Sequence, residues 1–184
     1  MTHQYGTAER NASLDAIETS IGVSPTLEIR TGTPPANCAA AATGTVLATM
    51  TLPSDWMSAA AAGAKALLGT WQDTAADASG IAGYFRISAV GTGRWQALTS
   101  EPWAGSKAYL LNQQASNGGN VYRCTTAGTS AAAGGPTGTG SGITDGGAVW
   151  NYIQTGVDMS LDNTSLNVGQ TVSFTALTIT AGGA

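Results

Sequence analysis

Turn-forming residues interrupt this chain at short intervals, and their spacing leaves little room for long helices. Between the interruptions lie short runs rich in β-branched residues, at 26–32, 45–52, 84–90, 164–169 and 170–180. In several of them apolar and polar residues alternate, which indicates strands with one face in a core. Short strands joined by Gly, Pro and Asn turns predict a mainly β chain with an antiparallel β-sandwich or jelly-roll-like domain.

The segments around these strands carry more specific signals. The sequence GTGRWQAL, residues 91–98, predicts the turn and the return strand of a hairpin. Imperfect alternation through residues 170–180 predicts a β-bulge near Ala176. Residues 53–69 are ambiguous, because their alanines favour a helix that Ser54 could cap, whereas Gly63 interrupts it. An irregular turn and a helix are both left open there.

One short helix is expected near the N-terminus, over residues 8–21. Leu14, Ile17 and Ile21 recur at three- and four-residue steps, and Gly22 provides a C-terminal stop. A helix with so narrow an apolar stripe is marginal in isolation, so it should dock on its own sheet or on a neighbouring subunit. The three stripe residues are therefore candidates for an attachment surface.

The segment from about Pro102 to Ile153 differs from its flanks in carrying most of the aromatic residues and the strongest turn signals. Asn117-Gly118 and Asp145-Gly146 are dipeptides suited to tight turns, and a short apolar run follows each. We predict two hairpins that bound a glycine-rich surface loop. The expected organisation is a small β-rich module at residues 99–155, inserted into a discontinuous base formed by residues 1–98 and 156–184.

The aromatic residues of this module admit two interpretations. We favour the first, in which they pack its core, because a small β module depends on aromatic area for stability. In the second they form an exposed platform on which a sugar ring stacks. The candidate platform residues are Trp103, Tyr109, Tyr122, Trp150 and Tyr152.

Composition excludes several partners. Charged residues make up only 10% of the chain and the net charge is −4, so no basic stripe is present to bind nucleic acid. No apolar run approaches the ~20 residues of a membrane span, and no export signal opens the chain, so we expect synthesis in a cytoplasm and no membrane. Cys38 and Cys124 should then be reduced. With His3 as the only histidine and no paired cysteines, we expect no metal and no cofactor.

The residues that enzymes use for catalysis form no motif here. No two carboxylates have a spacing that fixes a catalytic pair, and the serines lack a histidine partner or a nucleophile elbow. The glycine-rich GTGSG is not followed by the lysine of a phosphate loop. DTAADASG, residues 73–80, lacks the spaced ligands of a calcium loop and is interpreted as a solvated turn. We predict no enzymatic activity.

Four motifs of the base carry a resemblance to a known family. LEIRTGTPP, TGTVLATMTL, DTAADASGIAGYFRI and DMSLDNTSLNVGQTVSF cover much of residues 20–98 and 156–184. Together they resemble a family of small structural proteins of tailed bacteriophages and prophages. In that family the strand similar to FRI runs through a short connection to the segment similar to DMSL. This chain instead carries about fifty residues there, Thr99 to Thr155.

The inserted residues have a resemblance of their own. NVYRCTTAGTS, GPTGTGSGITDGGAVW and the upstream Trp103 are similar to a repeat in phage tail-fibre proteins that is related to chitin-binding-type carbohydrate-binding modules. The two resemblances imply a virion protein, as a capsid decoration or cement protein that binds the major capsid protein and forms a homo-oligomer, with a trimer expected. The alternative is a neck or tail accessory, or a fibre-like adhesin whose module binds host-surface glycans.

Overall fold

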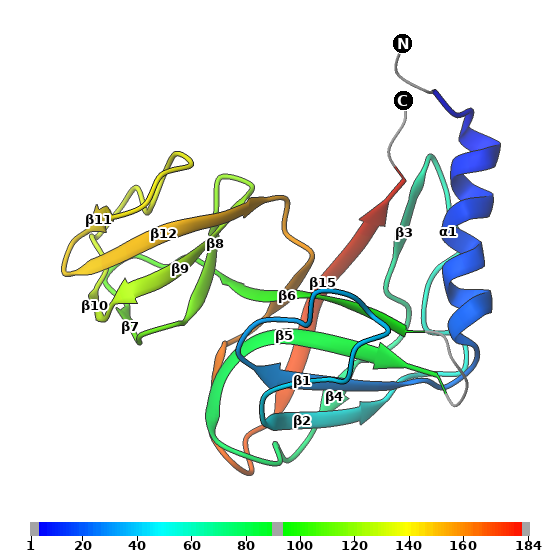
Figure 1. Ribbon diagram of the computed structural model, residues 1–184, viewed down its shortest axis with the longest axis horizontal. Coiled ribbons are helices and arrows are strands. Elements are labelled where there is room, and N and C mark those ends of the chain that lie inside the picture. The colour runs from blue at the N-terminus through cyan, green and yellow to red at the C-terminus, as the bar shows by residue number, and fades with distance from the viewer. Residues whose placement is uncertain (1–3, 90–93, 182–184) are drawn as a thin grey trace.

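The computed structural model describes residues 4–89 and 94–181 (Figure 1). The chain is mainly β with one short helix, and the predicted sandwich-like fold class is confirmed. The elements are α1 Thr7–Ile21, β1 Thr26–Thr31, β2 Val46–Thr51, β3 Ala64–Ala66, β4 Gln72–Asp73, β5 Gly80–Ser88, β6 Arg94–Pro102, β7 Ala108–Tyr109, β8 Gln114–Asn117, β9 Asn120–Thr126, β10 Gly128–Thr129, β11 Ile143–Asp145, β12 Ala148–Thr155, β13 Met159–Leu161, β14 Ser165–Leu166 and β15 Val172–Thr180.

The base is built from two groups of strands. In the first, β2, β1, β5 and the start of β6 pair antiparallel in that order. In the second, β15 pairs antiparallel with β13, β3 and β4. Figure 1 shows β15 running across the direction of β1 and β5, so the two groups form separate layers.

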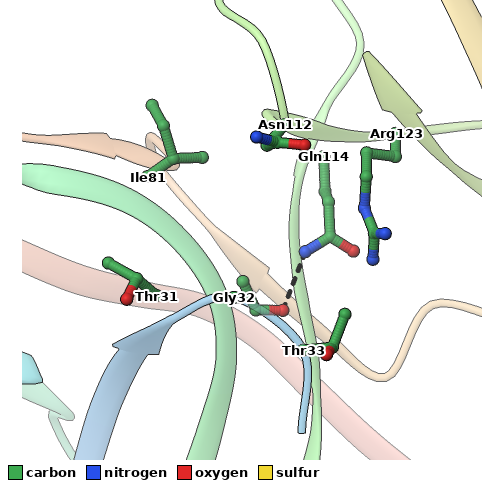
Figure 2. Close-up of a pocket in the computed structure, with 8 residues that line it drawn as sticks. Thr31, Gly32, Thr33, Ile81, Asn112, Gln114 and Arg123 are labelled. Carbon is green, nitrogen blue, oxygen red and sulfur yellow. Dashed lines mark hydrogen bonds between the residues drawn. The ribbon is translucent and has the colours of Figure 1, made fainter. Parts of the chain in front are cut away.

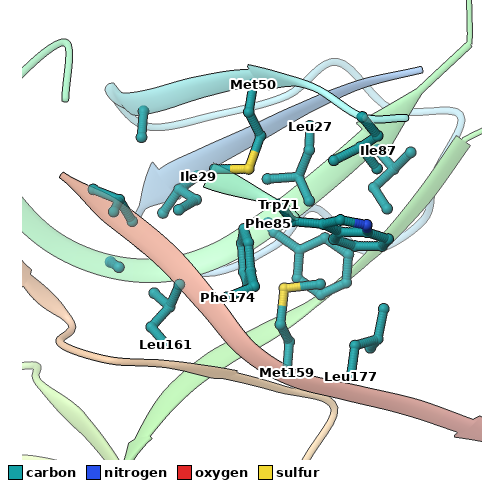
Figure 3. Packing of buried hydrophobic residues seen from close by; sticks show 14 of the residues in the cluster. Leu27, Ile29, Met50, Trp71, Phe85, Ile87, Met159, Leu161, Phe174 and Leu177 are labelled. Atoms are coloured by element: carbon teal, nitrogen blue, oxygen red, sulfur yellow. The ribbon is translucent and has the colours of Figure 1, made fainter. Parts of the chain in front are cut away.

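The main hydrophobic core lies between these layers. Figure 3 shows side chains from β1 and β5 meeting side chains from β13 and β15. The alternating residues Leu27 and Ile29 are completely buried, as are Phe85 and Ile87 on the adjacent strand. Period-two alternation in the sequence therefore identifies the core face of both strands correctly.

The strand β6 joins the base to the module. Its first half pairs antiparallel with β5, whereas Thr99 and Ser100 pair in parallel with Met159 and Ser160 of β13. The next residue, Glu101, pairs in parallel with Ala115 of β8. The strand β6 thus pairs with three other strands, and the antiparallel prediction does not include the two pairings that are parallel.

The module contains a four-stranded sheet, ordered β11, β12, β9 and β8, that continues from the end of β6, and a two-stranded sheet of β7 and β10. The β8–β9 hairpin turns at Gly118 and Gly119, whose φ angles are +57° and +80°, a conformation that glycine adopts without strain. The β11–β12 hairpin turns at Gly146, with φ +64°. Both predicted hairpins are confirmed.

The other local predictions have mixed outcomes. The ambiguous segment 53–69 contains no helix, since its backbone turns at Ala62 and Gly63, which have positive φ, before entering β3. The β13–β15 register shifts between Ala176 and Phe174, which confirms the predicted bulge. The return strand of the predicted 91–98 hairpin is β6, but residues 91–93 lie outside the described residues, as does His3.

Candidate functional site

The five aromatic residues proposed as a sugar platform do come together, but as the core of the module. Tyr109, Tyr122 and Trp150 are almost completely buried, and Trp103 and Tyr152 pack against them. The ring centroids of Tyr109 and Trp150 lie 4.7 Å apart in an edge-to-face arrangement. The platform hypothesis is therefore wrong for the three buried rings, because none of their faces is open to a ligand.

The indole N–H groups of this cluster are also used inside the module. Asp145 Oδ2 accepts hydrogen bonds from Trp103 Nε1 at 2.8 Å and from Trp150 Nε1 at 3.1 Å. Asp145 Oδ1 accepts one from the backbone N–H of Ala131 at 2.9 Å. Three donors thus compensate the desolvation of a buried carboxylate. The sequence predicts the turn that Asp145 starts, but no local signal shows that its side chain holds two indoles.

The glycine-rich loop over residues 130–142 is fastened to the module by side-chain donors. Asn117 Nδ2 donates to the backbone oxygens of Gly134 at 2.9 Å and Pro136 at 3.1 Å. The buried hydroxyl of Tyr122 donates to Gly138 O at 3.0 Å. The loop is therefore an ordered part of the module, held down from the strands beneath it.

Two titratable groups of the module core are held in their neutral forms. Burial raises the pKa of Tyr109 to about 12, although its hydroxyl accepts a hydrogen bond from the N–H of Ala104. Burial also raises the pKa of the Cys124 thiol. Cys124 and Cys38 form no disulfide with each other. A thiol held protonated and buried is a packing group and not a nucleophile.

The apolar stripe of α1 packs inward. Leu14 and Ile21 are buried, and Ile17 is partly buried against the main core. Of the two docking partners that the sequence leaves open, the helix takes its own base. The hypothesis that Leu14, Ile17 and Ile21 form an attachment surface is therefore wrong, since a particle could reach these side chains only if the helix left the base.

A polar stripe on α1 is the feature that sequence reasoning missed. Side-chain oxygens spaced four and three residues apart accept hydrogen bonds from the backbone of the irregular segment that precedes β3. The pairs are Asn11 with Gly63, Asp15 with Ala60, and Glu18 with Met57. The buried Lys65 forms ion pairs with Asp15 at 2.6 Å and Glu18 at 2.7 Å. The helix supplies the partners that this segment would otherwise find in a regular sheet.

A buried carboxylate ties the base to the module. Glu101 Oε1 accepts hydrogen bonds from Lys107 Nζ at 2.8 Å and Gln113 Nε2 at 3.1 Å, both in the module. Glu101 Oε2 accepts one from the backbone N–H of Thr164 at 2.9 Å, in the base. Because Glu101 is almost completely buried and fully bonded, it fixes how the two parts meet.

A cleft of about 320 Å³ opens where the two parts meet (Figure 2). Its walls are Thr31, Gly32, Thr33, Ile81 and Gly83 from the base and Asn112, Gln114 and Arg123 from the module. Gln114 Nε2 donates to Gly83 O at 2.8 Å, so this contact also joins the two parts. The lining residues are far apart in the sequence, and no pattern within one segment predicts that they meet.

Asp73 and Asp77 support local structure. Asp73 accepts hydrogen bonds from the backbone N–H groups of Thr49 and Ala75, and Asp77 accepts one from the Thr49 hydroxyl. These bonds agree with the predicted turn at 73–80. No metal-ligating cluster is found within the described ranges, and no helix in them has the length and hydropathy needed to cross a membrane.

Comparison with protein-family models, curated proteins and solved structures gave no match.

Proposed function

We propose that this chain is a non-enzymatic structural protein of a bacteriophage virion, which attaches by its base and displays the 99–155 module outward. A capsid decoration or cement role, with the major capsid protein as partner, is the form we favour. The observation that supports it is the pairing across the insertion, Thr99 with Met159 and Ser100 with Ser160. Because the strands before and after the insertion, β6 and β13, pair with each other, the base keeps its own fold while it carries a second module.

The family-like segments also belong to one structural unit. LEIRTGTPP contains most of β1, DTAADASGIAGYFRI contains most of β5, and DMSLDNTSLNVGQTVSF runs from β13 into β15. Side chains from all three enter the main core. The resemblance thus follows a packed domain instead of scattered loops, and the inserted residues contribute a separate aromatic cluster.

The joint between the two parts suits fixed display. The strand β6 is continuous from base to module, and the bonds of Glu101 to both parts restrain bending there. A protein that projects a module from a particle benefits from such a joint, because a flexible tether would let the module fold back onto the surface.

With the α1 stripe packed internally, attachment requires another surface of the base. Val23 and Leu68 are exposed apolar residues, and backbone groups at or beside both are bonded to Trp56. The Trp56 indole donates to Gly22 O at 3.0 Å, and its backbone oxygen accepts from Leu68 N at 2.9 Å. We place the particle contact at this Val23–Leu68 surface.

Binding to particles prepared without the protein tests the proposal. The purified full chain should cosediment with such particles, and a Val23→Asp, Leu68→Asp double variant should lose at least about tenfold in affinity because charge is placed in an apolar contact. A Leu110→Asp, Leu111→Asp double variant, which alters exposed leucines of the module, should bind normally. Absence of binding by the unaltered chain would refute attachment.

Copy number separates the capsid role from the alternative location. Hundreds of copies per particle indicate decoration, whereas six or twelve indicate a neck or tail accessory. The mass of the purified protein in solution tests the expected homo-oligomer, since a trimer is three times the 18.4 kDa chain.

A further inference from the structure

The cleft between base and module carries a positive charge in an otherwise acidic protein. Of its eight lining residues, Arg123 is the only charged one, whereas the chain as a whole has a net charge of −4. Among the described residues, the Arg123 side chain has no ion pair or hydrogen bond, unlike Arg30, Lys65 and Lys107, each of which pairs with a carboxylate. A guanidinium left free in a cleft is a ready partner for an anion.

One buried hydrogen-bond acceptor in the wall beside Arg123 has no partner. Gln114 is almost completely buried and its Oε1 has no partner, while its Nε2 is held by Gly83 O. Figure 2 shows the amide oxygen on the side of Gln114 that faces Arg123 and Thr33. Within the described part of the chain the other unpartnered buried side-chain atoms, Arg10 Nε, Thr99 Oγ1 and Thr164 Oγ1, do not line this cleft. An unpaired buried acceptor is uncommon and destabilising, which marks this wall as unusual.

The rest of the cleft is small, and its lining is partly polar and partly apolar. Its volume of about 320 Å³ is at the low end of the roughly 300–1,000 Å³ of ligand sites, and suits one sugar-sized molecule. Thr31, Thr33 and Asn112 offer hydroxyl and amide groups along its lining. Two of its lining residues are in close backbone contact, since a Cβ added at Gly83 would lie 1.8 Å from Gly32 O.

We propose that this cleft binds a small hydroxyl-bearing anion, whose negative group pairs with Arg123 and whose hydroxyl groups meet the polar lining. Two sources share this chemistry: the carboxylate of an acidic sugar and the phosphate of a polyol phosphate. Both contain the acceptor that a guanidinium binds through two parallel N–H groups. The site is separate from the buried aromatic rings and does not depend on attachment to a particle.

Calorimetric titration of the purified full chain at low salt tests the site with glucuronate and with glycerol 3-phosphate. At least one should bind, and the one that binds identifies the source. Glucose lacks the charge, and acetate and inorganic phosphate lack the hydroxyl groups, so all three should bind at least tenfold more weakly. If neither hydroxyl-bearing anion binds, or if a control probe binds as well, the proposal is wrong.

Paired arginine variants locate the binding. Arg123→Gln should weaken it at least about tenfold, because a charge-assisted bond is lost. Arg94→Gln is the matched control, since Arg94 also forms no ion pair with the described residues and does not line the cleft, and this variant should bind as the unaltered chain does. Near-ultraviolet circular dichroism checks that both variants keep the fold. Equal affinity of the two variants would exclude the cleft.

Discussion

The base and the module are stabilised in different ways. The base buries a large apolar core between two layers of strands, and its buried Arg86 and Tyr84 hold the loop before β2 through hydrogen bonds to Ala40 O and Thr43 O. The module has a much smaller core, and a carboxylate lies within it, bonded to two indoles. A unit of about fifty residues has little apolar area to bury, so directed hydrogen bonds contribute a larger share of its order.

The comparison predicts that the base is most sensitive to lost volume. Phe85→Ala removes a fully buried ring from the main core and should lower the free energy of unfolding by about 3–5 kcal/mol. Denaturant titration followed by tryptophan fluorescence measures the loss. The control Val168→Ala, at an exposed position, should stay within about 0.5 kcal/mol of the unaltered protein. Similar losses in both variants would contradict this view of the base.

The module should be most sensitive to one polar substitution. Asp145→Ala leaves three buried or partly buried donors without an acceptor and should cost roughly 2–4 kcal/mol. Hydrogen exchange should show the loss of protection in β9 and β12, with the base strands unchanged. Asp77→Ala, which removes one bond from an exposed side chain, is the control and should cost less than about 1 kcal/mol. Loss of protection spread evenly over both parts would show that they do not behave as separate cores.

The joint should respond less than either core. Glu101→Gln removes the charge that pairs with Lys107 and one acceptor oxygen, at an expected cost of about 2 kcal/mol. Faster exchange of the Thr164 amide and a broader distribution of module orientations in small-angle scattering should accompany it. Glu28→Gln, in a more exposed pair with Arg30, should leave both measurements unchanged. If the distribution of module orientations is unchanged in Glu101→Gln, the rigidity of the joint comes from β6 alone.

The smallest effect concerns pH and the docking of α1. The hydrogen bond from Lys65, with that from Ala60 N–H, lowers the pKa of Asp15 below 3.8. Because the pKa of Asp15 is lower in the folded state than in the unfolded state, its carboxylate stabilises docking at pH values above the unfolded-state pKa. This contribution is lost as the pH falls through the folded-state pKa. Burial alone would lower the pKa of Lys65, but its bonds to Asp15 and Glu18 raise it above 10.5, so its contribution is lost only at strongly alkaline pH.

Hydrogen exchange of the α1 amides across pH measures this effect. Protection, corrected for the intrinsic exchange rate, should decline below about pH 4. In Asp15→Asn the decline should be smaller, because the substituted side chain does not titrate. Module amides provide the internal control, since none of the α1 pairs involves the module. A decline of equal size in Asp15→Asn would rule out Asp15 as its source.

The sequence predicts what depends on neighbouring residues. Alternation at Leu27 and Ile29 identifies a core face, Asn117-Gly118 and Asp145-Gly146 locate two hairpins, and the broken alternation around Ala176 marks a bulge. In each case local backbone chemistry and the tertiary structure agree. The irregular course of residues 53–69 is harder to predict, because its alanines permit a helix and the polar stripe of α1 decides otherwise.

The candidate site is poorly predicted because its parts come from distant segments. Glu101 binds Thr164, which is 63 residues further along the chain, and Gln114 reaches back to Gly83. Arg123 appears in the sequence as one isolated cation in a strand, with no sign that it faces loop residues near Thr33. The aromatic residues do cluster as expected, but composition alone does not tell a core from a binding surface.

The pairing of β6 with β13 has a practical consequence for protein engineering. The chain leaves the base at Ser100 and re-enters it at Met159, on neighbouring strands. Adjacent strands lie about 5 Å apart, so any guest domain whose termini are equally close meets the geometric requirement for replacing the native insert. The base can therefore accept other inserted domains, because replacing the module leaves the core between β1, β5, β13 and β15 unchanged.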